Sequence, residues 1–232
     1  MALTVTLAQL RTQVRQRADM EDDGNFIADS ELNTWINESI SDLYDVLLES
    51  MGEDFYLSST TLTGDGTTEA FTLPTDFYLL RGVDATQGDE RIAIRPFHFR
   101  ERNRVRNSTS LSRFERTRYR LEGSATATGY TGKIRLLPAP PSGQGYIVWY
   151  TPLPPALSDD AHVWDGFNRW HEYVVVDVAI KARTKEESDT TDLRVRKAEL
   201  EARIRALSAV RDVSEPETVG DVTDDDDPAW VA

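Results

Sequence analysis

Apolar residues recur at helical spacing near the N-terminus. Leu7, Leu10 and Val14 follow one another at the i, i+3 and i+7 positions, which places their side chains on one face of a helix. Thr6 begins a capping-box pattern, in which Gln stands three positions after a hydroxyl residue. These features predict a short amphipathic helix over residues 7–18.

A longer helix is predicted to begin at about residue 30. Asp29 or Ser30 is placed to cap its N-terminus, and Gly52 is the expected C-terminal stop. Polar residues occupy one side of this segment, as in other surface helices. The opposite, apolar face carries Leu32, Trp35, Ile36, Ile40, Leu43 and Leu47.

Two further helices are expected toward the C-terminus. The first extends from about Trp164 to Lys185 and is rich in large apolar residues. The second is capped by Thr190 or Thr191 and carries a seam like one side of a coiled coil. The seam consists of Leu193, Leu200, Ile204 and Leu207. After Arg211 the apolar periodicity stops.

Between the two pairs of helices the pattern changes to short β-strands separated by Gly- and Pro-rich turns. Strands are expected at 55–57 leading into 60–63, and at 70–73, 77–80, 91–94, 118–121, 133–137 and 146–150. Pro96 suits the first position of a short helix that ends near Arg106. Strands and helices are thus segregated along the chain, which is typical of α+β proteins.

We therefore expect an α+β fold in which the N- and C-terminal helices form a helical bundle, with an antiparallel β module inserted between them. The helical body is assigned to residues 1–53 and 160–211, the β module to 54–155, and a flexible acidic tail to 212–232. The core of the helical body is expected to contain Trp35, Ile36, Leu43, Trp170, Tyr173, Leu200 and Ile204.

Charge is sorted by position along this 232-residue chain of net charge −14. Residues 91–120 hold ten arginines, no lysine and two acids, a local balance of +8. Residues 1–90 balance at −14, and residues 212–232 hold eight acids and no base. Such separation is expected of a subunit that docks on a partner or on copies of itself, because complementary potentials fix partner and register.

The arginine-rich segment has two interpretations. One is nucleic-acid binding, with aromatic residues interleaved between the cations. The other, which we favour because the same chain is so acidic, is a protein interface that pairs with carboxylates bidentately. The interface candidates are Arg95, Arg100, Arg102, Arg104, Arg106, Arg113, Arg116 and Arg118.

The C-terminal segment ends with four consecutive aspartates, a proline, an alanine and a tryptophan. A calcium loop alternates its ligands with spacers and includes a glycine, and this run does not. Two interpretations stay open: a solvated flexible tail, or a docking peptide steered by charge and anchored by an aromatic residue. The docking candidates are Asp221, Asp224, Asp225, Asp226, Asp227 and Trp230.

The residue types that carry catalysis form no recognised pattern here. His98, His162 and His171 lack the spacing of metal ligands, and the two Gly-x-Gly segments do not open a helix after a strand. A pair of carboxylates for glycoside hydrolysis cannot be singled out among 40 acidic residues. We therefore expect neither an enzyme nor a bound metal or cofactor.

Zero cysteine excludes disulfides and thiol chemistry, and it fits synthesis in a reducing cytosol. No apolar run approaches the ~20 residues of a membrane span, and the first residues lack the pattern of a signal peptide. We expect a protein that is made in the cytoplasm and does not contact a membrane.

Three stretches resemble the head-to-tail adaptor, or connector, proteins of tailed bacteriophages. They are the segments Asp29–Asn37, Leu73–Leu80 with its Leu-Pro-x-Asp-Phe sequence, and Glu172–Asp189. Arg211-Asp212 and Glu215-Pro216-Glu217 continue the likeness, which extends from about residue 5 to residue 220. The arginine-rich segment aligns with no family motif.

The resemblance implies a structural virion protein located in the neck between capsid and tail. Such adaptors form a ring of copies, usually twelve, below the portal protein, where they extend the DNA channel and provide a platform for downstream tail proteins. DNA passes without sequence-specific contact, and the C-terminal segment commonly reaches the portal. The alternatives are a nucleic-acid-binding module that uses residues 91–120, and a virion-associated hydrolase.

Overall fold

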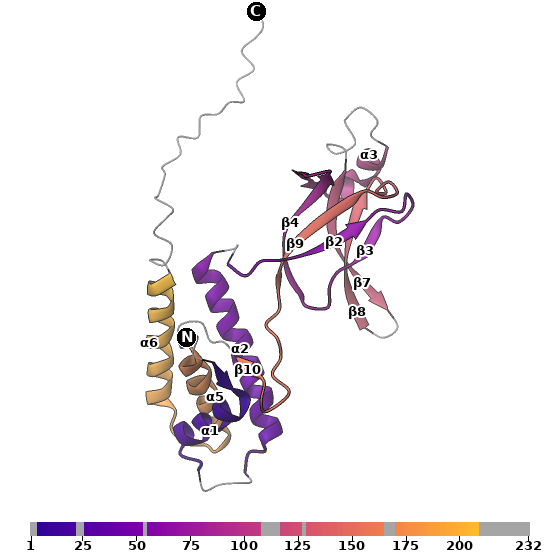
Figure 1. Cartoon of the computed structure of the whole chain (residues 1–232). Coiled ribbons are helices and arrows are strands. Elements are labelled where there is room, and N and C mark those ends of the chain that lie inside the picture. Colours follow the sequence, from indigo (N-terminus) through magenta and orange to yellow (C-terminus); the bar gives the residue numbers. More distant parts are fainter. Residues whose placement is uncertain are drawn as a thin grey trace, which may run out of the picture.

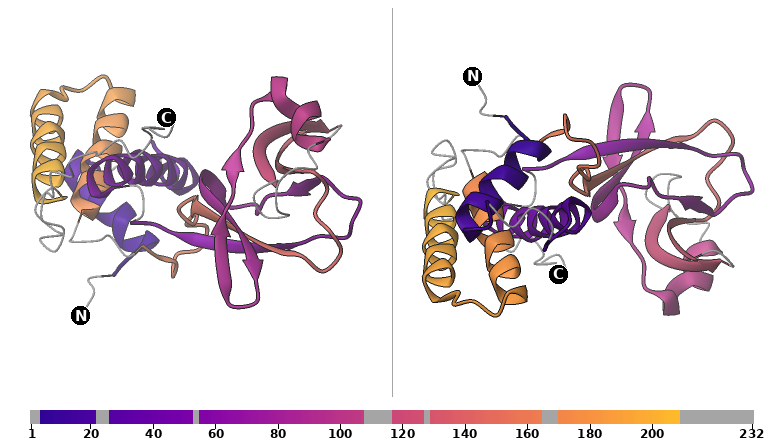
Figure 2. Two further views of the ribbon diagram at one scale, coloured as in Figure 1. Left: turned by 90° about the horizontal axis from the view of Figure 1, so that it is seen from above. Right: turned by 90° about the horizontal axis from the view of Figure 1, so that it is seen from below.

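The computed structural model of the chain describes residues 4–21, 26–52, 55–107, 117–126, 129–164 and 170–208. The described residues are mixed α+β, as expected. Helices from both ends of the chain gather in one unit, and most of the strands form a second unit beside it (Figure 1). The views from above and below in Figure 2 show the same separation.

The first two helices follow the sequence pattern closely. Helix α1 (Leu7–Ala18) begins at the predicted capping box, because the Thr6 side chain accepts from the Gln9 amide and the Gln9 side chain accepts from the Thr6 amide. Helix α2 (Asp29–Met51) ends before Gly52 as expected. The predicted cap of α2 was wrong, since Ala28 holds the N-cap position. Asp29 lies instead in the first turn, where its charge suits the helix dipole.

The two C-terminal helices are α5 (His171–Lys185) and α6 (Thr191–Ser208). The predicted start of the first at Trp164 was wrong. Trp164 belongs to the short strand β10 (Val163–Trp164), which pairs with β1 (Val5–Thr6). This pairing joins segments far apart in the sequence, so local periodicity carries no sign of it.

Helices α1, α2, α5 and α6 surround one apolar core. Of the expected core residues, six are buried: Ile36, Leu43, Trp170, Tyr173, Leu200 and Ile204. Trp35 is only partly buried and packs against the edge of this core. Leu207 does not extend the α6 seam, because its side chain is 47% exposed beyond the end of the core.

The β module contains two four-stranded sheets, with strand orders β2-β9-β4-β5 and β3-β8-β7-β6. The strands are β2 (Ser58–Thr63), β3 (Ala70–Thr72), β4 (Phe77–Gln87), β5 (Glu90–Ala93), β6 (Arg95–Pro96), β7 (Arg118–Thr126), β8 (Gly129–Leu137) and β9 (Gly145–Pro152). Their shared core is formed by Leu73, Val83, Ala85, Ile94, Ile134, Leu136, Tyr146 and Val148.

Three details of the β module differ from the prediction. Residues 55–57 are not a strand, and β2 begins at Ser58. Pro96 does not open a helix but lies in β6, which pairs with β7 in the parallel direction rather than the expected antiparallel one. The short helix follows later, as the 3-10 helix η1 (Phe99–Glu101) and then α3 (Arg102–Arg106). Proline at the edge of a sheet needs no amide donor, which permits this placement.

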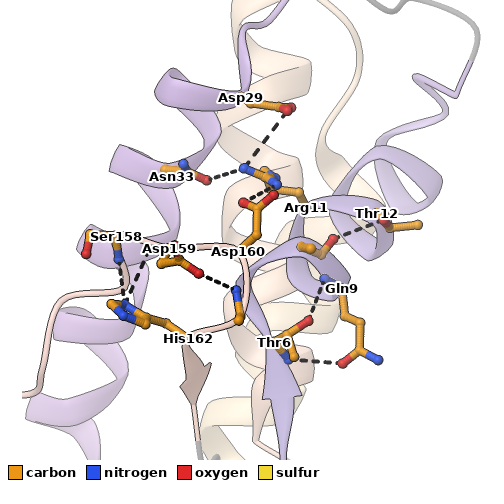
Figure 3. A network of polar contacts seen from close by, with 12 residues as sticks. Thr6, Gln9, Arg11, Thr12, Asp29, Asn33, Ser158, Asp159, Asp160 and His162 are labelled. Carbon is orange, nitrogen blue, oxygen red and sulfur yellow. Dashed lines mark hydrogen bonds and ion pairs between the residues drawn. The ribbon is translucent and has the colours of Figure 1, made fainter.

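A polar network ties the N-terminal helix to the return of the chain from the β module (Figure 3). Arg11 donates to Asn33 of α2 at 3.3 Å and to Asp160 at 2.6 Å. His162 accepts the amides of Ser158 and Asp159 at its Nδ1 atom, at 3.2 and 3.3 Å. Because the Nδ1 atom of His162 accepts hydrogen bonds from these two backbone amides, His162 helps to fix the turn that precedes it.

Tyrosines connect the helical unit to the β module. Tyr44 of α2 donates its hydroxyl to the Pro152 carbonyl at the end of β9, at 2.6 Å. Tyr78 of β4 donates in the reverse direction, to Asp45 of α2 at 2.7 Å. Burial raises the pKa of Tyr44 to about 12, and the hydrogen bond to Asp45 raises the pKa of Tyr78, so both hydroxyls remain protonated donors at neutral pH. These contacts bind the two units at their junction.

Candidate interaction surface

The described part of the arginine-rich segment, residues 91–107 and 117–120, lies toward the end of the β module that is distant from the helical unit (Figure 1). A small apolar cluster of Phe97, Val105 and Leu137 anchors α3 next to β8. The Phe97 amide also donates to the Tyr119 carbonyl of β7 at 2.9 Å. Residues separated by 20 or more positions in the sequence are thereby brought around one surface.

Part of the positive charge is paired within the molecule. The Glu69 carboxylate accepts from Arg106 at 2.6 Å and from Arg135 at 3.0 Å. Arg135 also donates from its Nε atom to Glu122 at 2.9 Å. The hydrogen bond to Glu122 is the main reason why the pKa of Arg135 is raised. Arg106 and Arg135 are therefore held in place by a chain of alternating charges.

Two other arginines, Arg102 and Arg120, contact the aromatic ring of Phe99. The guanidinium carbon of Arg102 lies 4.2 Å from the centre of this ring, and that of Arg120 lies 4.8 Å from it. Both contacts have the geometry of cation–π interactions. The Nη1 atom of Arg120 is buried and has no hydrogen-bond partner in the described part of the chain. The Phe99 side chain itself is 56% exposed.

These groups line a cavity of about 450 Å³, which we call the arginine pocket. Its walls come from η1, α3, β7 and β8, and they combine apolar and cationic side chains. The lining residues are Phe97, Phe99, Arg102, Arg106, Arg120, Leu121, Glu122, Gly123, Arg135 and Leu137. Four guanidinium groups thus face one carboxylate in the lining, so the pocket has an excess of positive charge.

Four other predicted interface arginines that the structure describes do not line the pocket. Arg95 and Arg100 are exposed, while Arg118 is half-buried in β7. Arg104 is exposed and pairs with Glu101 at 2.5 Å. Arg113 and Arg116 lie outside the described residues.

Sequence reasoning missed part of the pocket. Glu122 and Arg135 line the pocket but lie outside the 91–120 segment, and the paired strands β7 and β8 bring them to it. Glu69, which binds Arg106 and Arg135, immediately precedes β3, the strand that pairs with β8. The only local signal is on β8, where Arg135 alternates with the buried residues Ile134 and Leu136 and so must point away from the core. The candidate tail residues Asp221, Asp224, Asp225, Asp226, Asp227 and Trp230 also lie outside the described residues.

Metal-binding side chains are not gathered into a site in the part of the chain that the structure describes. There, no three His, Asp or Glu side chains are placed to hold a metal ion. None of the described helices is long and apolar enough to cross a membrane. The arginine pocket holds positive charge and aromatic surface, which suits binding of an anionic group.

Comparison with known proteins decides the family. The family model described as SU10 adaptor protein matches residues 5–220. The chain belongs to this family of bacteriophage head-to-tail adaptors. No curated protein matches the chain. The adaptor family is structural and is not a known enzyme family, and its members are virion-associated proteins that interact with other head or tail proteins.

Proposed function

We propose that this adaptor forms a ring of copies below the portal protein, in the neck between capsid and tail. The ring extends the DNA channel and provides the platform on which downstream tail proteins attach. The family match over residues 5–220 carries this proposal. The expected number of copies is twelve, as is usual in such adaptors.

The two units of the chain suit different tasks in such a ring. The helical body, which corresponds to residues 1–53 and 160–211, shares one apolar core and would build the ring wall. The β module (54–155) would face the tail or a neighbouring copy, since its distant end presents the arginine pocket and the surrounding exposed arginines. A net charge of −14 favours a channel that DNA passes without adhering.

The acidic segment 212–232 is proposed to dock on the portal. It holds eight acids and no base, and Trp230 near its end is the apolar anchor. An exposed ion pair contributes at most ~1 kcal/mol, so charge alone would steer the segment but not hold it. The four aspartates and the tryptophan should therefore all be needed for docking on the portal.

The ring is tested by mixing the adaptor with its portal protein and examining the mixture by native mass spectrometry and electron microscopy. We expect a closed ring of adaptor copies on the portal. An adaptor that stays monomeric and ignores the portal would remove the proposal.

The docking segment is tested by deleting residues 212–232 and, separately, by Trp230→Ala. Both changes should weaken portal binding and leave the circular dichroism spectrum of the folded chain unchanged. Replacing Asp224–Asp227 by asparagine removes four negative charges and retains the length of the segment. This variant therefore measures how much the charge alone contributes to portal binding. A truncated adaptor that binds portal as well as the full chain would contradict the docking role.

A further inference from the structure

Two arginines of the pocket lack a carboxylate partner in the described residues. Arg102 contacts the Phe99 ring and donates to the Phe99 carbonyl at 3.1 Å, and Arg120 contacts the same ring from 4.8 Å. In the described part of the chain, the buried Nη1 atom of Arg120 has no hydrogen-bond acceptor, and no carboxylate neutralises either guanidinium. Guanidinium groups pair readily with carboxylates, so the pocket is suited to receive an anionic group from outside.

The shape and charge of the pocket define the ligand. Guanidinium groups in a fixed fork match the two oxygens of a carboxylate. Phe99 and Leu121 are exposed at 56% and 46% and offer apolar surface next to the cations. A cavity of about 450 Å³ accommodates one or two side chains. The matching ligand is a peptide segment that places carboxylates beside an apolar or aromatic side chain.

A nucleic-acid backbone fits the pocket less well. Binding a polyanion requires a track of cations that displaces its counterions. Here Arg106 and Arg135 are already paired with Glu69 and Glu122, and Glu122 itself lines the pocket. Among the described residues, the positive charge without a carboxylate partner is therefore concentrated at Arg102 and Arg120, which suits a short acidic segment.

We propose that the arginine pocket binds the acidic C-terminal segment, residues 212–232, of a neighbouring copy of this chain. That segment has eight acids and no base, and its aspartates 224–227 are followed closely by Trp230. Carboxylates next to an aromatic residue complement the pocket, where the guanidinium groups of Arg102 and Arg120 lie against the Phe99 ring. Fully extended, 21 residues reach about 70 Å, so the end of the segment can lie far from the helical unit of its own copy.

This inference rests in part on the proposed assembly of copies. It adds that the segment binds a neighbouring copy first and the portal afterwards. A contact from the tail of one copy to the pocket of the next is head-to-tail, the type that generates rings. The portal and the pocket would then compete for the same segment. The pocket would hold the segment on a neighbouring copy until the portal displaces it.

The test uses the full chain with the photoreactive residue p-benzoylphenylalanine in place of Trp230. Copies labelled with heavy nitrogen are mixed with unlabelled copies, so that a cross-link between two copies is distinguished by mass from one within a copy. We expect cross-links between the two copies, from position 230 to the segments 97–102 and 120–123, and their loss when aspartates 224–227 are replaced by asparagine.

The Arg102→Gln/Arg120→Gln variant should also lose the cross-link. The matched control is Arg194→Gln/Arg203→Gln, which removes two exposed arginines of α6 and should retain it. Because Arg120 is half-buried, the single Arg102→Gln variant is measured as well, with the thermal unfolding midpoint as a check of folding. Arg102 is exposed, so this variant should fold normally and still reduce the cross-link.

Several outcomes would overturn the proposal. Cross-links that map elsewhere, that stay within one copy, or that survive Arg102→Gln/Arg120→Gln would show that the pocket does not hold the segment. Displacement of the segment by a stoichiometric single-stranded oligonucleotide would assign the pocket to nucleic acid instead. No portal is present in this assay, so its failure leaves portal docking untouched, and failed portal docking leaves this contact testable.

Discussion

Replacing Lys197 by methionine should destabilise the helical unit more than replacing any surface lysine. The Lys197 ammonium on α6 lies 2.8 Å from the Asp177 carboxylate on α5, whose side chain is only 7% exposed. Asp177 also accepts from Ser39 of α2 and lies 3.2 Å from Lys181. One buried carboxylate thus joins three helices.

The magnitude follows from burial. Removing one partner of a fully buried ion pair typically costs about 3–5 kcal/mol, because the other charge is left uncompensated. Here the Lys197 side chain is 26% exposed and Lys181 remains beside Asp177. We therefore expect Lys197→Met to lower the free energy of unfolding by about 2 kcal/mol, less than the fully buried value. Methionine retains the packing of the aliphatic stem.

The pH dependence provides a second, independent measure. Burial would raise the pKa of Asp177, but hydrogen bonds from Lys197 and Ser39 and the charge of Lys181 lower it on balance. A carboxylate with a lowered folded-state pKa contributes stability above its unfolded value of about 4, and this contribution is lost as pH falls through the folded pKa. The difference between wild type and Lys197→Met should therefore shrink below about pH 4.

Urea unfolding followed by tryptophan fluorescence, repeated over a series of pH values, measures both effects. The matched control is Lys185→Met on α5, because Lys185 pairs with Glu31 at 2.7 Å in a more exposed position. That surface pair should contribute less than ~1 kcal/mol. The reasoning is refuted if the two variants lose equal stability, or if the loss in Lys197→Met persists unchanged at acid pH.

Three further predictions concern packing and the junction. Ile204→Ala should lower the free energy of unfolding, measured by chemical denaturation, by about 2–5 kcal/mol. Leu207→Ala should lower it much less, because of these two residues only Ile204 lies in the core. Equal losses would contradict the observed end of the seam. Gly64→Ala should lower the unfolding midpoint while Gly82→Ala should not, because a Cβ at Gly64 would clash with the Pro141 carbonyl oxygen and one at Gly82 has no described heavy atom within 4 Å; an unchanged midpoint for Gly64→Ala would show that this turn can relax. Tyr44→Phe should cost about 1 kcal/mol in urea unfolding through loss of its hydrogen bond to the β9 end; no loss would mean that water replaces this bond without cost.

Much of the fold could be predicted because its signals are local. The capping box at Thr6 and the apolar face of α2 need only residues within one or two turns, and both appear in the structure. Alternation along β8 and β9 likewise identified the strands of the sheet cores. The predictions failed where distant segments pair, as at Trp164 with Val5 and at Pro96 with Tyr119.

The arginine pocket shows the same division. The sequence by itself determined the excess of arginine between residues 91 and 120, the acidic C-terminal segment and the α+β order of elements, since composition and periodicity are properties of short stretches. Only the tertiary structure decided which arginines are neutralised. Strand pairing carries Glu69 and Glu122 to Arg106 and Arg135 and leaves Arg102 and Arg120 beside Phe99. Charge pairing acts over a few ångströms, so it depends on distances that only the folded chain sets.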